Sequence, residues 1–270
     1  MISWRNIFKG IRSTSSTLIN QNMRQTGKIV INKVEKTKSP KKSNPLSPTT
    51  CQIIEFGLVS LNRLLIGFVT IYMCWMCLRV ELQEIPFHAI LCTVGFVCLM
   101  SEGLMAHYRG NAWTKLCNRI EKTRTHWLLQ LIGSIVGLVG VGIKICIEDI
   151  HFHTLHGIVG LVTTILLLLG LVSGLSALYA NEMRNFMQPL FNKTLHNMWG
   201  LMTYTLVMAS MYTAYDTDIF VEYSLDAATY NDFKWLIQIS IVGIWALTSY
   251  GPLWCLVYTK IWNTNFRCQQ

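Results

Sequence analysis

Six apolar runs, each about twenty residues long, constrain the fold of this chain most strongly. A helix needs roughly 20 apolar residues to cross the hydrocarbon core of a bilayer. The chain is 51% hydrophobic and only 14% charged, with a mean hydropathy of +0.36, whereas soluble domains carry about 25% charged residues. We therefore predict an all-α integral membrane protein with six transmembrane helices. The predicted spans are about 57–78, 87–106, 127–146, 156–179, 196–214 and 235–258.

The basic residues predict how these helices are oriented. The segment 1–50, the loops after the second and fourth spans and the C-terminal segment hold 19 of the 23 Lys and Arg residues. The loop before the last span carries five acids instead. Because positive loops stay in the cytoplasm, both termini are predicted to be cytoplasmic. The net charge of +9 is thus explained by topology, and no nucleic-acid partner is expected.

Composition divides the chain into three parts. Residues 1–50 form a basic tail, predicted to be disordered and cytoplasmic; residues 51–262 form the six-span domain; residues 263–270 form a short cytoplasmic tail. The N-terminus has polar residues where a secretory signal would be apolar. Its first 34 residues carry six Lys and Arg without an acid, so a mitochondrial transit peptide and a helix on an anionic membrane surface stay open as alternatives.

Four histidines stand near the starts of four successive predicted spans. His88 and His156 fall on the lumenal side, and His126 and His196 fall on the cytoplasmic side. Two neutral imidazoles from opposite sides can ligate a haem iron axially and leave no position for oxygen. The pattern therefore predicts a four-helix bundle, spans 2–5, that holds two b-type haems and conducts electrons across the bilayer. Glycines in the third and fourth spans, 133, 137, 140, 157, 160, 170 and 174, are expected to make room for them, although small residues also serve ordinary helix packing.

Two other functions are compatible with the same residues. A helix-end histidine can simply bond a carbonyl, in which case the chain is a non-enzymatic membrane scaffold or receptor. His151, His153 and His156 also form a His-x-His-x-x-His pattern that suits zinc, so a metal transporter that uses His151, His153 and Glu148 is a further alternative.

The order of the motifs resembles the cytochrome b561 family, over roughly 57–260. The resemblance is carried by Phe87-His88, Ser101-Glu102-Gly103-Leu104-Met105, His126-Trp127-Leu128-Leu129-Gln130, Leu155-His156-Gly157 and Leu195-His196. It implies two haem b groups with axial iron ligands His88 with His156 and His126 with His196. The chain departs from the family at Ala89, where many members have proline.

The resemblance also implies the reaction and its partners. The donor would be cytoplasmic ascorbate, and the acceptor would be lumenal or extracellular monodehydroascorbate radical or ferric ion. The chain would thus be a transmembrane ascorbate-dependent oxidoreductase, and the resemblance leaves room for a homodimer. We expect the endoplasmic reticulum or another endomembrane vesicle in preference to the plasma membrane.

Basic residues near the cytoplasmic histidines are the candidates for binding ascorbate, which is a monoanion at neutral pH. Lys122, Arg124 and Arg109 are in this position, and the alternative for each is retention of positive charge on the cytoplasmic side. Glu102 lies 14 residues after His88, roughly 21 Å along a helix. It could accept the proton that ascorbate loses or bond a ligand imidazole; the alternative is an ion pair with Arg109.

Overall fold

The structure, a computed structural model, describes residues 50–79, 84–149, 152–217 and 227–267, and in the last helix it describes the side chains of 233–257. The predicted tail up to residue 49, His151, most of the acidic loop and residues 268–270 lie outside the described residues. The elements are α2 (Thr50–Leu78), α3 (Glu84–Cys92), η1 (Thr93–Met100), α4 (Ser101–Met105), α5 (Arg119–Ile147), α6 (Leu155–Leu178), η2 (Glu182–Asn185), α7 (Pro189–Ala214) and α9 (Ala227–Arg267).

The elements of the described chain are all helices, and five helical segments are long and apolar enough to cross a membrane. These segments are α2, the continuous rod formed by α3, η1 and α4, and then α5, α6 and α9. Helix α7 is 26 residues long but is less apolar, because amide and hydroxyl side chains interrupt it. The fifth predicted span, 196–214, therefore stays a prediction.

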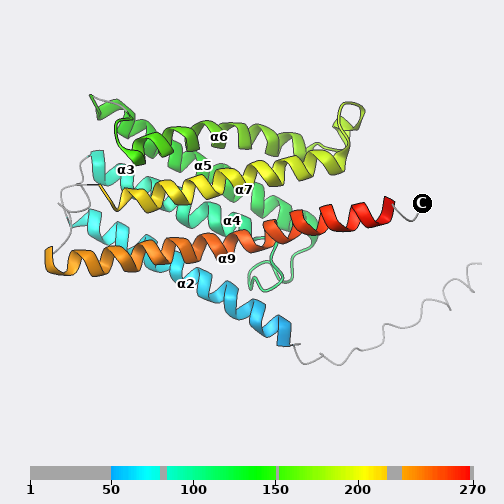
Figure 1. Ribbon diagram of the computed structural model, residues 1–270, viewed down its shortest axis with the longest axis horizontal. Coiled ribbons are helices and arrows are strands. Elements are labelled where there is room, and N and C mark those ends of the chain that lie inside the picture. The colour runs from blue at the N-terminus through cyan, green and yellow to red at the C-terminus, as the bar shows by residue number, and fades with distance from the viewer. Residues whose placement is uncertain (1–49, 80–83, 150–151, 218–226, 268–270) are drawn as a thin grey trace, which may run out of the picture. The chain divides into compact units, whose positions relative to one another are not determined.

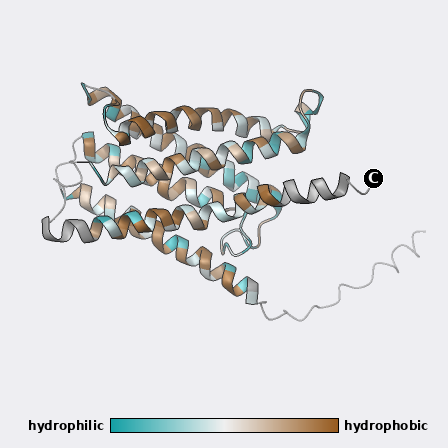
Figure 2. Ribbon diagram, viewed as in Figure 1, coloured by the Kyte–Doolittle hydropathy of each residue, from teal (hydrophilic) through white to brown (hydrophobic). Residues whose placement is uncertain are grey.

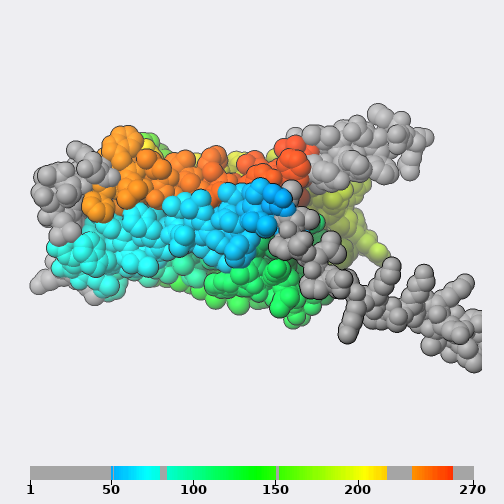
Figure 3. Space-filling model, turned by 90° about the horizontal axis from the view of Figure 1, so that it is seen from below, coloured from blue at the N-terminus to red at the C-terminus, as the bar shows by residue number. Residues whose placement is uncertain are grey.

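The helices pack as pairs (Figure 1). The α3–η1–α4 rod packs along α5, α6 packs along α7, and α9 packs against both α2 and α7. Figure 3 shows α2 and α9 side by side on one face. Figure 2 shows the apolar residues along the helices and the more hydrophilic ones toward the connecting loops. Two helix pairs, the rod with α5 and α6 with α7, thus carry the four histidines.

The buried core lies where α2, η1, α7 and α9 meet. Val69, Val97 and Ile237 have no exposed surface, and Val207 has 1%. These branched side chains belong to one buried cluster. Helices α2 and α9 therefore pack against the histidine-bearing helices and help to hold them in place.

Gly133, Gly137 and Gly140 of α5 serve helix packing, which the sequence left open as the alternative to making room for a cofactor. A methyl group on Gly95 of η1 would stand 2.6 Å from the carbonyl oxygen of Gly133 and from the nitrogen of Gly137. At Gly137 it would overlap the ring of Phe96, and at Gly140 it would stand 3.0 Å from Cys92 Sγ. The rod and α5 thus touch backbone to backbone, which only glycine permits.

Two histidines lie deeper in their helices than predicted, because α5 and α7 begin earlier. Helix α5 begins at Arg119 because Asn118 and Glu121 form a capping box in which each side chain accepts from the other's backbone N–H. Helix α7 begins at Pro189, a residue suited to the first helical position. His126 and His196 are each the eighth residue of their helix, whereas His156 is the second residue of α6.

The second span is also less regular than predicted. Residues Thr93–Met100 form a π-helical stretch between α3 and α4. Such stretches are rare and often occur at functional sites. Here the stretch places the short helix α4 beside the start of α5.

Candidate functional site

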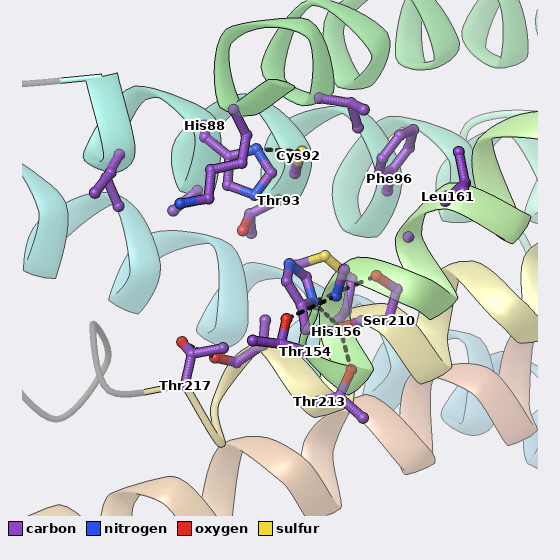
Figure 4. Close-up of a pocket in the computed structure, with 18 of the residues that line it drawn as sticks. His88, Cys92, Thr93, Phe96, Thr154, His156, Leu161, Ser210, Thr213 and Thr217 are labelled. Carbon is purple, nitrogen blue, oxygen red and sulfur yellow. Dashed lines mark hydrogen bonds between the residues drawn. The ribbon is translucent and has the colours of Figure 1, made fainter. Parts of the chain in front are cut away.

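The structure brings His88 of α3 and His156 of α6 together, and we name them the outer pair after their predicted side of the membrane. Their ring centroids are 6.2 Å apart and the ring planes meet at 74°. They face a cavity of about 470 Å³ whose wall includes Phe96, Leu161 and Ser210 (Figure 4). The two imidazoles reach this cavity from different helix pairs.

His126 of α5 and His196 of α7 form the matching inner pair. Their ring centroids are 6.3 Å apart and their planes meet at 76°. Both pairs therefore have nearly the same separation and the same mutual ring angle. The same arrangement of two imidazoles therefore occurs twice, and both copies suit the same kind of bound group.

Hydrogen bonds fix the same tautomer in all four rings. Nδ1–H of His88 donates to the Gly140 carbonyl, that of His126 donates to the Gly103 carbonyl, and that of His156 donates to the Ser210 carbonyl, each at 2.9 Å. A carbonyl oxygen can only accept, so the proton must sit on Nδ1 in these three rings.

His196 reaches the same state through a hydroxyl. Ser173 Oγ donates to the Gly170 carbonyl at 2.8 Å, so at 3.2 Å it accepts from His196 Nδ1–H. Each Nε2 therefore keeps a free lone pair for a metal. Metal-bound histidines usually donate their other N–H to such a partner.

The donor set fits an iron held between two imidazoles. Two metal–nitrogen bonds of about 2.0–2.1 Å, together with the two ring radii, account for most of a centroid separation of 6.2–6.3 Å. The largely apolar cavity wall suits a macrocycle such as haem. The Cys74–Cys77 pair is followed by Leu78 and not by histidine, so the motif for covalent haem attachment is absent from this sequence.

The two pairs lie one above the other along the bundle. His126 and the residue that supports the outer pair, Gly140, are fourteen positions apart on α5. His196 and Ser210 have the same spacing on α7. Fourteen residues of α-helix measure about 21 Å. Both helices thus connect the two sites over most of the thickness of a bilayer core, about 30 Å.

Of the three predicted substrate-binding cations, Lys122 is best placed. It lies one helical turn before His126 on α5, and so on the same face. Arg124 and Arg109 are exposed, and the backbone N–H of Arg109 donates to Glu55.

His107 also lies beside the inner pair, a contact that the sequence did not reveal. Its ring centroid is 5.3 Å from that of His126. Desolvation by the surrounding residues, together with electrostatic interactions with His126, Lys122 and Arg119, lowers the pKa of His107 to about 4, although part of the residue stays exposed. Its neutral ring adds no charge to this end of the bundle at physiological pH.

Glu102 pairs with Arg63 of α2, so the alternative pairing with Arg109 is wrong. Its carboxylate accepts two hydrogen bonds, from Arg63 Nε at 2.9 Å and from Nη2 at 3.1 Å. The ion pair with Arg63 was not predicted from the sequence. The sequence did carry a signal for this pair, because Glu102 and Arg63 each stand inside an apolar run, where a charged side chain needs a partner.

At the outer end, Lys144 and Glu148 form an ion pair within α5. His153 and Glu148 also line the outer cavity. Within the residues that the structure describes, no group of three or more His, Cys, Asp and Glu side chains could hold a metal ion; His151 lies outside them. The metal-transporter alternative therefore gains no support from the described part of the chain.

Comparison with known proteins agrees with this geometry. The sequence model of the family described as eukaryotic cytochrome b561 matches residues 87–221, a range that includes all four histidines. The protein named transmembrane reductase CYB561D2 from Mus musculus is 29% identical over 130 residues, which cover 46% of this chain and 58% of that protein. The proteins of the same name from Bos taurus and Homo sapiens match with the same values. The chain thus spans 58% of the length of the curated relatives it matches.

Proposed function

The chain belongs to the eukaryotic cytochrome b561 family, whose members are haem b proteins, and we propose that it transfers electrons across a membrane from cytoplasmic ascorbate to a lumenal or extracellular acceptor. Membership makes it an integral, multi-pass membrane oxidoreductase. The acceptor in this proposal is monodehydroascorbate radical or ferric ion. The observation that carries the proposal is the pair of matched histidine pairs, one above the other along the bundle.

In this proposal each pair holds one haem b, with His88 and His156 as ligands of the outer group and His126 and His196 as ligands of the inner one. Iron held by two imidazoles has no open coordination position, so it would pass electrons instead of activating oxygen. The acceptors on Nδ1 hold each ring in place and keep its Nε2 available. The carbonyl acceptors also make the imidazoles more basic, which strengthens their bonds to a metal.

Six spans support this function better than five. Helix α7 is 26 residues long, or about 39 Å, which exceeds the hydrocarbon core of about 30 Å. Asn192 Nδ2 donates to the Ser176 carbonyl near one end of α6, and the Ser210 carbonyl accepts from His156 near the other. Because α7 runs along α6 in this way, we infer that it crosses the membrane with α6, and that both termini are cytoplasmic.

In this proposal, ascorbate binds the basic surface beside the inner pair. Lys122 can attract the ascorbate monoanion, and Arg124 and Arg109 extend the positive surface at the same end. Glu102 is held in an ion pair by Arg63, so we no longer assign it the proton that ascorbate loses.

A spectrum of the purified protein tests the proposal. We expect a reduced-minus-oxidised difference spectrum of the b type on adding ascorbate, and two haems for each chain by pyridine haemochrome analysis. Dithionite reduction of the same sample gives the total haem as a control. A helical, monodisperse protein without haem absorbance would refute the proposal and leave the scaffold or receptor alternative.

A further inference from the structure

Three consecutive residues of α4 each bind a different helix. Ser101 Oγ hydrogen-bonds Tyr204 OH of α7 at 2.7 Å. Glu102 pairs with Arg63 of α2. The carbonyl of Gly103 accepts from His126 Nδ1 of α5 at 2.9 Å. The position of this one turn therefore determines where His126 of the inner pair finds its hydrogen-bond acceptor.

Helix α4 is too short for its own backbone hydrogen bonds to hold it in place. It is five residues long and follows the π-helical stretch η1, in which hydrogen-bond geometry departs from the regular α-helix. The Gly103 carbonyl accepts from the Ala106 N–H at 3.3 Å, and its second lone pair accepts from His126. Contacts from neighbouring helices must then fix the turn.

Among these three contacts, the Arg63–Glu102 pair is the one between two charged side chains. Its side chains are 20% and 13% exposed, and the guanidinium donates two bonds to one carboxylate. Two-pronged Arg–carboxylate pairs are geometrically specific. Removing one partner of a buried pair leaves the other charge uncompensated, which is strongly destabilising.

The same guanidinium also fixes the loop that follows α4. Arg63 Nη2 donates to Asn111 Oδ1 at 2.7 Å, and Asn111 Nδ2 donates to the Met105 carbonyl at 2.9 Å. Asn111 is 2% exposed. The loop continues from His107, whose ring lies beside His126. Arg63 thus holds the chain on both sides of the Gly103 acceptor.

We propose that Arg63, which lies outside the four histidine-bearing helices, is a positioning residue for the inner histidine pair. It acts through Glu102 on the Gly103 carbonyl and so sets the orientation of the His126 ring relative to His196. The inference rests on the proposed function, because the ring orientation matters for electron transfer only if the inner pair ligates haem.

Electron paramagnetic resonance of the oxidised protein tests this directly, because the low-spin signal of a bis-imidazole iron depends on the angle between its ligand planes. The inner signal is identified as the one that His126→Ala abolishes. Arg63→Lys keeps the charge but loses the planar two-pronged geometry. The double variant Arg63→Met with Glu102→Met replaces the ion pair by apolar residues of similar size, a change that proteins often tolerate. We expect both variants to move the inner signal and to leave the outer signal in place.

The control is Lys234→Gln, which breaks the pair of Lys234 with Asp216 at the other end of the bundle. We expect it to leave the inner signal in place. An unmoved inner signal in either Arg63 variant, or an equal shift in the Lys234 control, overturns the role of Arg63. An unmodified protein without low-spin haem signals instead overturns the proposed function.

Discussion

Replacing Gly95 by alanine tests the backbone contact on which both histidine pairs depend. The new methyl group would stand 2.6 Å from the Gly133 carbonyl oxygen and the Gly137 nitrogen, whereas ordinary contacts begin at 3.4 Å. Both obstacles are backbone atoms, so no side chain can rotate to make room. The rod and α5 must therefore separate by up to about 0.8 Å, the difference between the two distances.

That separation affects both sites, because two of the histidine hydrogen bonds cross this same interface. His88 on the rod donates to α5, and His126 on α5 donates to the rod, each at 2.9 Å. A shift of this size takes them beyond the usual N–H···O range of about 2.7–3.2 Å. Overpacking of this kind costs about 1–3 kcal/mol. At about 2–4 °C per kcal/mol for a chain of this size, we expect the melting temperature in detergent to fall by several degrees and the haem content of both sites to fall with it.

The matched control lies on α5 itself. A methyl group on Gly142 would meet no atom within 4 Å, so Gly142→Ala should leave haem content unchanged. It should stabilise the helix by about 0.5–1 kcal/mol, the usual gain from glycine to alanine. Melting curves followed by haem absorbance and by circular dichroism measure both effects. If Gly95→Ala melts at or above the temperature of Gly142→Ala with full haem content, the close contact of the rod with α5 is refuted.

Removing one ligand, by His126→Ala, should remove about half of the haem, because the two pairs share no ligand; pyridine haemochrome analysis measures this, and an unchanged ratio would reassign the ligands. Burial and neighbouring positive charge lower the pKa of His107 to about 4 from about 6.5 in the unfolded chain, so the unfolded state binds more protons and stability falls as the pH drops from 6.5 to 4. His107→Gln should make the melting temperature fall less steeply between pH 6.5 and 4, and it should not change the pH dependence above pH 7. An unchanged decline would contradict the lowered pKa of His107. Tyr108→Phe should cost about 1–3 kcal/mol, because Pro252 has no N–H for the Thr248 carbonyl and Tyr108 OH donates to it instead; an unchanged melting temperature would show that water replaces the hydroxyl.

The order of the motifs predicted the family, and the family match confirms it. Hydropathy predicted the helical membrane fold, and five of the six spans are found in the described residues. Long apolar runs leave few alternatives to helices, because a backbone inside lipid must satisfy its own hydrogen bonds. The helix starts were less predictable. Capping by Asn118 and Glu121 extends α5 into polar sequence, where hydropathy carries no signal.

The ion pair of Arg63 was missed because sequence distance was used as a guide to proximity. Arg109 lies near Glu102 in the chain, whereas Arg63 lies 39 residues away. Charge balance would have been the better guide, since an acid and a base that both stand inside apolar runs need partners. The side-chain partners available at that depth are few, and Arg63 is one of them.

The groups that accept hydrogen bonds from the four histidines could hardly be predicted from the sequence. Three of the four acceptors are backbone carbonyls, which every residue carries. Ser173 is the exception, and a serine in a membrane span can equally bond the carbonyl of its own preceding turn. The glycine pattern did hold a signal, and the structure favours helix packing, the second of its two interpretations. Gly140 and Gly103 supply two of the carbonyls, and the absence of a side chain lets the neighbouring helix come close enough for an imidazole to reach them. Glycine spacing in this chain therefore positions the histidines by bringing helices together, and the cavity at the outer pair is lined by residues of both helix pairs.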